Sequence, residues 1–133
     1  MTTRQRVSSG TMWEDRVGYS RAVRVGPFGY VSGTTAVDAA GTPQHPGDAE
    51  GQMRYALEKA LHALEELGFD KRHVVRTRMF VTDIAAWPAM GDAHGAFFRD
   101  VRPCATMVEV SKLIDPALLV EVELDAVDDG AVA

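Results

Sequence analysis

Residues 48–68 carry the strongest structural signal in the sequence, an apolar stripe with the period of an α-helix. The stripe consists of apolar residues three or four positions apart: Met53, Ala56, Leu57, Ala60, Leu61, Leu64 and Leu67. Gly47 and Asp48 are suited to cap the start of this helix, and Gly68 its end. A helix with one apolar face must be covered by a second layer. The rest of the chain therefore has to supply a sheet or further helices.

Strand patterns account for most of the remaining sequence. Six stretches are β-branched, aromatic or alternating in polarity: 4–8, 20–25, 28–36, 74–82, 104–111 and 119–127. Gly26 and Pro27 predict a hairpin between the second and third stretches, and Asp115 and Pro116 predict a short turn between the last two. We expect residues 9–18 and 37–47 to be loops and the tail from residue 128 to be frayed.

A second helix is predicted between the fourth and fifth strands. Thr82 or Asp83 can cap it, and it is expected to end near Val101. Pro88 falls early enough to be tolerated. The residues expected to face inward are Ala93, Ala96 and Phe97.

The predicted order is β-β-β-α-β-α-β-β within a single domain that spans residues 1–133. This order indicates an α+β fold with a mixed sheet and two helices on one face. The other face of the sheet is then bare. We expect a second copy of the chain to cover it, so the protein should be oligomeric.

Composition and charge exclude several classes of partner. The formal net charge is −5, and the densest basic stretch, around Arg76 and Arg78, is flanked by Asp70 and Asp83. A nucleic-acid partner is therefore not expected, because such proteins usually carry a basic stripe. No apolar run is long enough to span a bilayer, and residues 1–10 lack the apolar core of a signal peptide. These features predict a cytoplasmic protein without a membrane partner.

The sequence contains none of the common cofactor or nucleophile motifs. GxGxxG, the P-loop and GxSxG are all missing. The four histidines lie in different predicted elements, without metal-ligand spacing, so no metal site is expected: His45, His62, His73 and His94. The single cysteine, Cys104, excludes an intrachain disulfide, and we expect it to be a small buried hydrophobe.

Two carboxylates stand within apolar strand sequence. Glu109 lies between Val108 and Val110, and Glu121 lies between Val120 and Val122. Strand alternation places both on the solvent face, and the pattern alone favours this interpretation. The alternative is that one of them lies in a cleft and orients water or transfers a proton.

Five segments, in order and in register, resemble the RidA family, also called YjgF. They are VGYSRAVRVGPFGYVSG, VVRTRMFVTDI, HGAFF, PCATMVEVSKL and VEVELDAV, and they extend from Val17 to Val127. The resemblance implies a chorismate mutase-like fold and a homotrimer with small-molecule sites in the clefts between subunits. It also implies hydrolysis of reactive imines or enamines, a deaminase activity that uses no cofactor.

The resemblance assigns roles to particular residues. Tyr19 matches the family's cleft tyrosine, Ser32 and Gly33 match its strand-end serine and glycine, and Glu121 matches the glutamate that positions or activates water.

Three positions depart from the pattern. Ala105 stands where the family has the arginine that binds the substrate carboxylate, Met107 replaces a cysteine, and Ala85 matches an asparagine found in many members.

The loss of that arginine predicts an altered substrate class. A guanidinium holds a carboxylate through two charge-assisted hydrogen bonds, and losing one such bond costs about 1.5–3 kcal/mol. Arg78 or Arg102 could supply the missing charge, and Arg78 is favoured because it alternates with Thr77 and Met79.

Alternatively, the ligand is neutral or cationic and contacts Glu121 or Glu109. Trp13 and Glu14, just before Tyr19, could close over it.

Three functions follow from these observations. The first is a RidA-like hydrolase of a reactive imine or enamine, with Glu121 and Tyr19 in the catalytic site. The ligand-binding residues would be Ser32, Gly33, Arg78, Ala105, Met107 and Trp13. The second is a trimer that binds or senses a small molecule without catalysis. The third is an RNA-cleaving protein, which the acidic charge disfavours.

Overall fold

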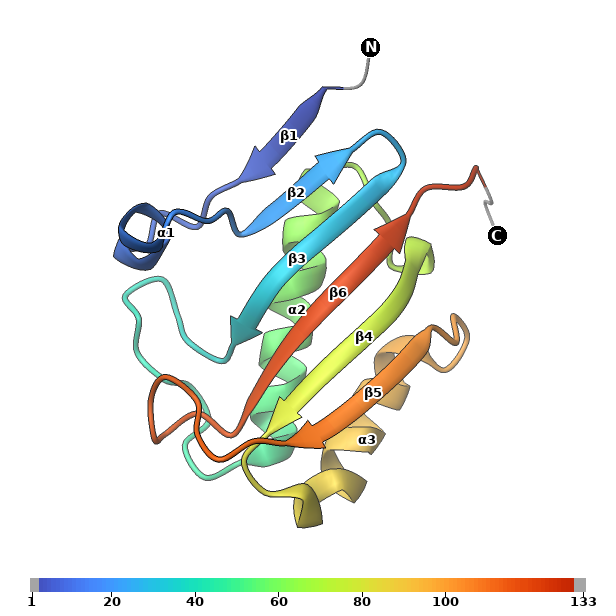
Figure 1. Ribbon diagram of the computed structural model, residues 1–133. Helices are drawn as coiled ribbons and strands as arrows, with labels where there is room; N and C mark the ends of the chain where they lie inside the picture. Colours follow the sequence, from blue (N-terminus) through green and yellow to red (C-terminus); the bar gives the residue numbers. More distant parts are fainter. Residues whose placement is uncertain (1–2, 131–133) are drawn as a thin grey trace.

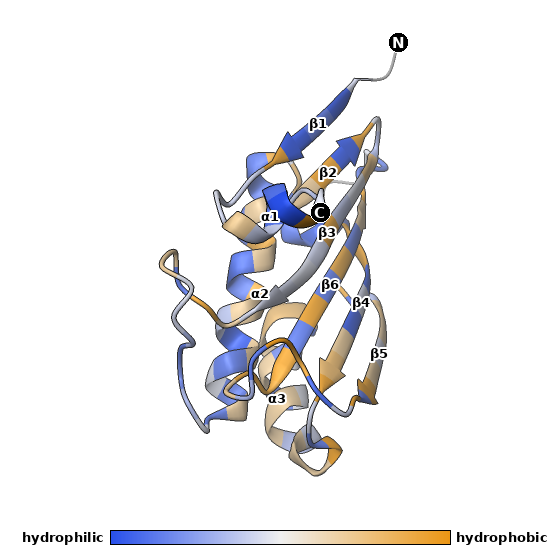
Figure 2. Cartoon of the chain, turned by 60° about the vertical axis from the view of Figure 1, so that its left-hand side comes forward, coloured by the Kyte–Doolittle hydropathy of each residue, from blue (hydrophilic) through white to orange (hydrophobic). Residues whose placement is uncertain are grey.

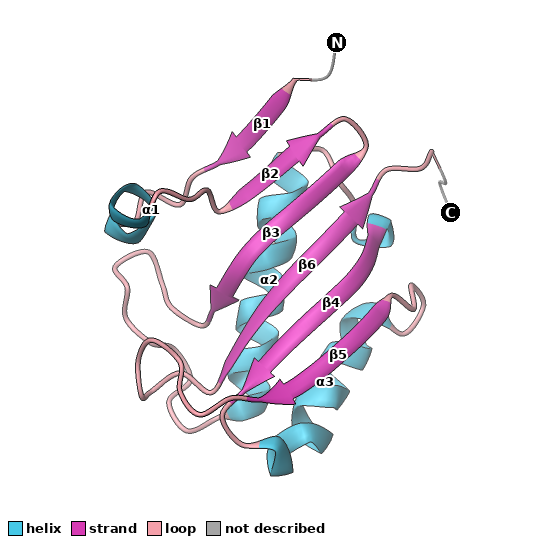
Figure 3. Ribbon diagram, viewed as in Figure 1, coloured by secondary structure: helices cyan, strands magenta, loops and turns pink. Residues whose placement is uncertain are grey.

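A six-stranded mixed sheet forms the centre of the computed structural model, which describes residues 3–130 (Figures 1 and 3). The strands are β1 (Arg4–Val7), β2 (Ala22–Val25), β3 (Phe28–Thr35), β4 (Val74–Val81), β5 (Cys104–Glu109) and β6 (Val120–Val127). Their order across the sheet is β1-β2-β3-β6-β4-β5. The pair β4–β5 is parallel and the other neighbours are antiparallel. The predicted mixed sheet and the hairpin between β2 and β3 are confirmed.

Two long helices, α2 (Ala49–Glu66) and α3 (Trp87–Phe98), cover one face of this sheet (Figures 1 and 2). The other helical segments are short: α1 (Met12–Val17), η1 (Lys71–His73) and η2 (Ile84–Ala86). The predicted α+β class, with two helices against one face, is confirmed. Figure 2 shows the alternation of polar and apolar residues along β6, and the buried positions of this strand are its apolar ones.

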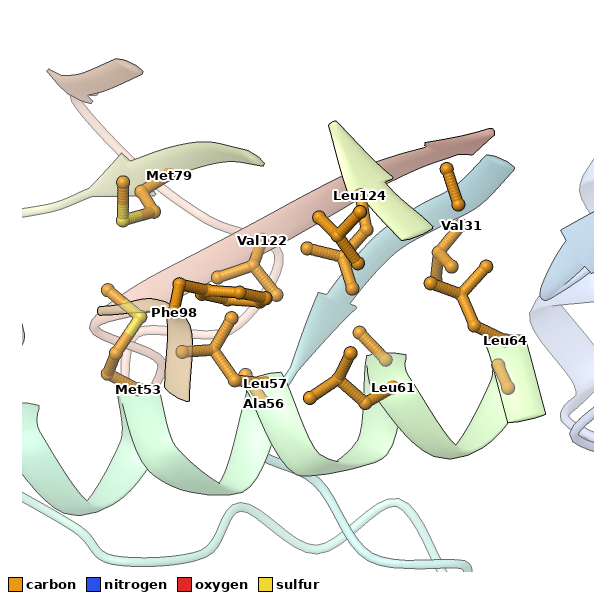
Figure 4. Close-up of a cluster of buried hydrophobic side chains, with 14 of the residues drawn as sticks. Val31, Met53, Ala56, Leu57, Leu61, Leu64, Met79, Phe98, Val122 and Leu124 are labelled. Carbon is orange, nitrogen blue, oxygen red and sulfur yellow. The ribbon is translucent and has the colours of Figure 1, made fainter. Parts of the chain in front are cut away.

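The helix α2 begins and ends where its sequence predicts. The Asp48 side chain accepts a hydrogen bond from the Gly51 amide at 2.9 Å, which satisfies a free donor of the first turn. The residue after the C-cap Leu67 is Gly68, which has a φ of +85°, a conformation that glycine adopts without strain. Figure 4 shows the apolar side of α2 packed against Val122 and Leu124.

The segment predicted as a loop at 9–18 contains the helix α1. Its anchor is Glu14, which is buried and accepts hydrogen bonds from the Ser9 amide at 3.1 Å and from the Ser9 hydroxyl. The Gly18 amide donates to the Glu14 carbonyl oxygen at 2.8 Å, and Gly18 has a φ of +89°. A polar network and a glycine C-cap thus stabilise α1. The segment has no apolar stripe, so its sequence pattern did not predict a helix.

The last two strands are not joined by a short turn, as the sequence predicted. The connection covers residues 110–119, and β4 lies between β5 and β6. Gln52, which is fully buried on α2, holds this connection: its side chain donates to the Ala117 carbonyl oxygen and accepts from the Leu119 amide, both at 2.8 Å. Every second residue of β6 is apolar and buried along the whole strand, which is consistent with its central place in the sheet.

The helix α3 also differs from its prediction. Asp83 caps the turn η2 rather than α3, and α3 begins at Trp87 and ends at Phe98. Met90, Ala93 and Phe98 are buried and Phe97 is partly buried against the core, whereas Ala96, which was expected to face inward, is exposed. The expectation of a buried Cys104 is wrong as well: it is exposed on β5, which lies at an edge of the sheet.

Candidate functional site

An irregularity in β3 opens the sheet at Ser32 and Gly33. The pairing of β3 with β6 shifts between Val31 and Thr34, so the two residues between them lie outside the regular register. The Ser32 hydroxyl donates to the Ser20 carbonyl oxygen at 2.6 Å, which ties the bulge to the segment before β2. The bulge therefore has a fixed shape.

The Glu121 side chain lies directly over this bulge. It comes from the face of β6 that points away from the helices, and a Cβ atom at Gly33 would overlap its carboxylate. A side chain at position 33 would therefore displace the carboxylate of Glu121. The structure thus brings together Ser32, Gly33 and Glu121, three residues that the family resemblance selected.

The environment of Glu121 changes its acidity. The carboxyl group is half-buried, and burial raises its pKa above the ordinary value of 4.5. The positive charge of Arg21 acts in the opposite direction, and the neighbouring Glu123 raises the pKa further. A raised pKa makes the carboxylate a stronger base, which suits a group that accepts a proton and returns it.

Arg21 is the site residue that the sequence reasoning missed. Its Nη2 donates to the Gly33 carbonyl oxygen at 2.6 Å, and its guanidinium lies 5.8 Å from the centre of the Tyr19 ring. Its Nε is buried and has no hydrogen-bond partner within residues 3–130. Arg21 therefore joins Tyr19, the bulge and Glu121 into one cluster with a cation at its centre.

Tyr19 reaches this cluster from the segment just after α1, through its contact with Arg21. The Tyr19 amide donates to the Glu14 carbonyl oxygen at 3.0 Å, and its ring is 37% exposed. Trp13 lies on α1 itself and is also exposed. Both aromatic side chains leave surface open to a ligand or to another subunit.

Arg78 lies on the same open face of the sheet but is already paired. Its Nη1 is 3.2 Å from an Asp125 oxygen and 3.7 Å from a Glu123 oxygen. The other arginine considered, Arg102, is exposed in the turn before β5 with a φ of +61°. The arginine whose charge acts on Glu121 is Arg21.

Ala105 and Met107 occupy the other face of the sheet from Glu121. In the β4–β5 register they stand beside Thr77 and Met79, which are buried on the helix side. Within one chain they do not meet the cluster around Arg21.

Two further candidates, Glu109 and Ala85, make no contact with the cluster around Arg21 that the structure shows. Glu109 accepts a hydrogen bond from the Ile84 amide at 3.0 Å and so holds η2, and Ala85 is exposed in η2.

The described residues contain no group of three or more histidine, cysteine, aspartate or glutamate side chains arranged to hold a metal ion. No helix among residues 3–130 combines the length and the apolar character needed to cross a bilayer.

Comparisons of the chain with known proteins show the family to which it belongs. Residues 13–128 match the family described as endoribonuclease L-PSP. A similar protein, the 3-aminoacrylate deaminase RutC of Acinetobacter baylyi, is 32% identical over 104 residues, which are 78% of this chain and 82% of that protein.

Two solved structures show the same fold. Rv2704 of Mycobacterium tuberculosis, a member of the YjgF/YER057c/UK114 family, is 46% identical to this chain, with a TM-score of 0.86. The aligned region covers 94% of this chain and 99% of the Rv2704 chain. PA3499 of Pseudomonas aeruginosa is 32% identical with a TM-score of 0.82 and covers 97% of this chain and 95% of its own. The chain therefore belongs to the endoribonuclease L-PSP family, the YjgF/RidA family.

Proposed function

We propose that the protein hydrolyses reactive imines or enamines of small metabolites and that Glu121 activates the attacking water. The observation that carries the proposal is the half-buried Glu121 carboxyl group over the Ser32–Gly33 bulge, beside Arg21. The similarity to a 3-aminoacrylate deaminase supports the same reaction class.

The proposed reaction needs only water and a group that moves protons. Water attacks the imine carbon, the electron pair of the C=N bond moves to nitrogen, and Glu121 takes a proton from the water. Return of that proton to nitrogen gives a carbinolamine. Transfer of its hydroxyl proton to the same nitrogen, with cleavage of the C–N bond, then releases ammonia and a carbonyl compound. An enamine first accepts a proton on carbon to become the imine. The Ser32 hydroxyl is already bonded to Ser20, so its proposed role is to hold the bulge, and the Tyr19 ring would form one wall of the pocket.

The proposed substrate class follows from the arrangement of cations. Ala105 cannot bind a carboxylate, and Arg78 is paired with Asp125 and Glu123. Arg21 has a buried Nε without a partner in the described chain and lies beside Glu121. We infer that an acidic imine, if used, is held by Arg21 rather than by the residue at position 105.

We also propose that the site is completed in a homotrimer in the cytoplasm. The face of the sheet opposite the helices exposes Phe28 (47%) and Tyr30 (49%), which a second copy would cover. Assembly would also allow Ala105 and Met107 of one chain to approach the Glu121 cluster of another. Sedimentation equilibrium should report three chains per particle, and a monomer at micromolar concentration would contradict this part of the proposal.

The direct test is an assay of ammonia release. A pyridoxal-phosphate lyase generates 2-iminobutyrate and related acidic, neutral and cationic imines, and their hydrolysis is compared with and without the protein. We expect acceleration for at least one class. Absence of acceleration for all three, with a small molecule still bound, would support a binding or sensing protein instead. Binding and cleavage of RNA would support the third alternative.

The pH dependence of hydrolysis should report the environment of Glu121. The reaction needs the carboxylate form, so the rate should fall as pH decreases through the pKa of Glu121. Since burial raises that pKa, the acid limb should lie above pH 4.5, the ordinary value for glutamate. The profile of kcat/KM for the free enzyme checks this expectation, and an acid limb at or below 4.5 would contradict it.

A further inference from the structure

A cavity of about 420 Å³ lies between α2, the N-terminal segment and the chain after β3, apart from the face that carries Glu121. Its lining residues are Val7, Ser8, Ser9, Thr11, Arg21, Val37, Asp38, Ala39, Tyr55, Lys59, His62, Ala63 and Glu66. Arg21 links this cavity to the Glu121 cluster because its guanidinium borders both.

Two cations, Lys59 and Arg21, line this cavity, and the nearby Glu14 carboxylate acts on both. Lys59 is half-buried on α2, and burial, together with the nearby charge of Arg21, lowers its pKa below the ordinary value, although Asp38 and Glu14 act to raise it. Like charges at short range destabilise each other, and burial adds to that cost. An anionic group between Lys59 and Arg21 would remove both effects.

The acidic residues near the cavity are occupied by other donors. The Asp38 carboxylate accepts hydrogen bonds from the Ala40 and Thr42 amides, each at 2.9 Å. Glu66 pairs with His62 at 3.2 Å, and Glu14 accepts from the Ser9 amide and hydroxyl.

Lys59, by contrast, has donors to spare. Its Nζ donates to the Val37 carbonyl oxygen at 3.1 Å, which uses one of its three N–H groups. The Arg21 Nε has no partner within the described chain. The unused hydrogen-bonding capacity around the cavity therefore consists of cationic donors.

We propose that this cavity is a second binding site, which takes a compact anionic group, a carboxylate or a phosphate, between Lys59 and Arg21. Charge-assisted hydrogen bonds from an ammonium and a guanidinium are the strongest that a protein offers to such a group. The apolar part of the lining, which includes Val7, Val37 and Ala63, suits a small metabolite with one acidic end. This site shares Arg21 with the Glu121 cluster, and Lys59 is the cation that belongs to the cavity alone.

The test measures binding of two probes, inorganic phosphate and acetate, by calorimetric titration at constant ionic strength. The unmodified protein should bind one or both in a saturable manner, and phosphate as the better ligand would indicate a phosphorylated metabolite. Lys59→Met should weaken binding at least about tenfold, the effect of losing one hydrogen bond to a charged group. Lys59→Arg should retain binding.

The matched control is Lys71→Met, which removes a lysine far from the cavity, near Asp100, and should leave binding unchanged. Observation of the Lys59 side-chain 15N signal in the unmodified protein provides a readout that needs no variant, and the signal should move with added probe. Equal binding by Lys59→Met and the unmodified protein would overturn the proposal. So would a Lys59 signal that neither probe moves.

Discussion

Replacing Glu121 with glutamine is expected to slow imine hydrolysis about 10²- to 10⁴-fold, the usual contribution of a general acid or base. Glutamine has nearly the same shape, so it can remain over Gly33, but it cannot accept a proton from water. Since burial disfavours the charged form of Glu121, the neutral amide should leave the free energy of unfolding almost unchanged. Initial rates of ammonia release and urea denaturation measure the two quantities.

A second variant separates the position of the carboxylate from its charge. Gly33→Ala keeps Glu121 but places a methyl group where its carboxylate lies, so the flexible end of the glutamate has to move. We expect a loss of rate of about 10²-fold or more with the protein still folded. Glu58→Gln, an exposed carboxylate on α2, is the matched control and should retain the full rate. Full activity of Glu121→Gln would remove the basis of the proposed mechanism.

The elements that bury one face along their whole length could be predicted from the sequence. The stripe of α2 and the alternation of β4 and β6 are written directly in residue order, because burial selects every third or fourth residue in a helix and every second in a strand. The helix α1 and the start of α3 at Trp87 could not be predicted in this way. The first depends on the hydrogen bond that the buried Glu14 carboxylate accepts from the Ser9 amide. The second follows the turn that Asp83 caps by accepting from the Ala85 amide.

The candidate site was predictable only in part. The pattern around Glu121 alone favoured a solvent-facing carboxylate, and its grouping with Tyr19 and Gly33 came from the family resemblance. The side chain is half-buried because the bulge in β3 receives it, and a bulge has no signal in the alternation of residues.

Arg21 was missed for a related reason. It stands immediately before β2, and its guanidinium donates to the carbonyl oxygen of the bulged Gly33, a contact that strand alternation does not predict. Ala105 lies on the helix side of the sheet, beside Thr77, so no contact within the chain relates it to this cluster.

The core offers a prediction about stability that does not depend on function. Phe98 is 2% exposed at the end of α3, and Figure 4 shows its ring among Met53, Leu57 and Val122, where α2, α3 and β6 meet. The ring fills the junction of three elements, so the surrounding residues cannot close a cavity without moving a helix. Phe97, the adjacent residue, is only partly buried against the same core.

Phe98→Ala is therefore expected to lower the free energy of unfolding by about 3–5 kcal/mol, the range for removing a buried aromatic ring. The cost combines the lost burial of the ring with the cavity that remains, and it should exceed that of the matched variant Phe97→Ala. Urea denaturation of the two variants and the unmodified protein at one protein concentration measures the difference, because any self-association would make stability depend on concentration. A loss below about 1 kcal/mol for Phe98→Ala would show that α3 can shift to refill the space and that its packing on α2 does not fix its position.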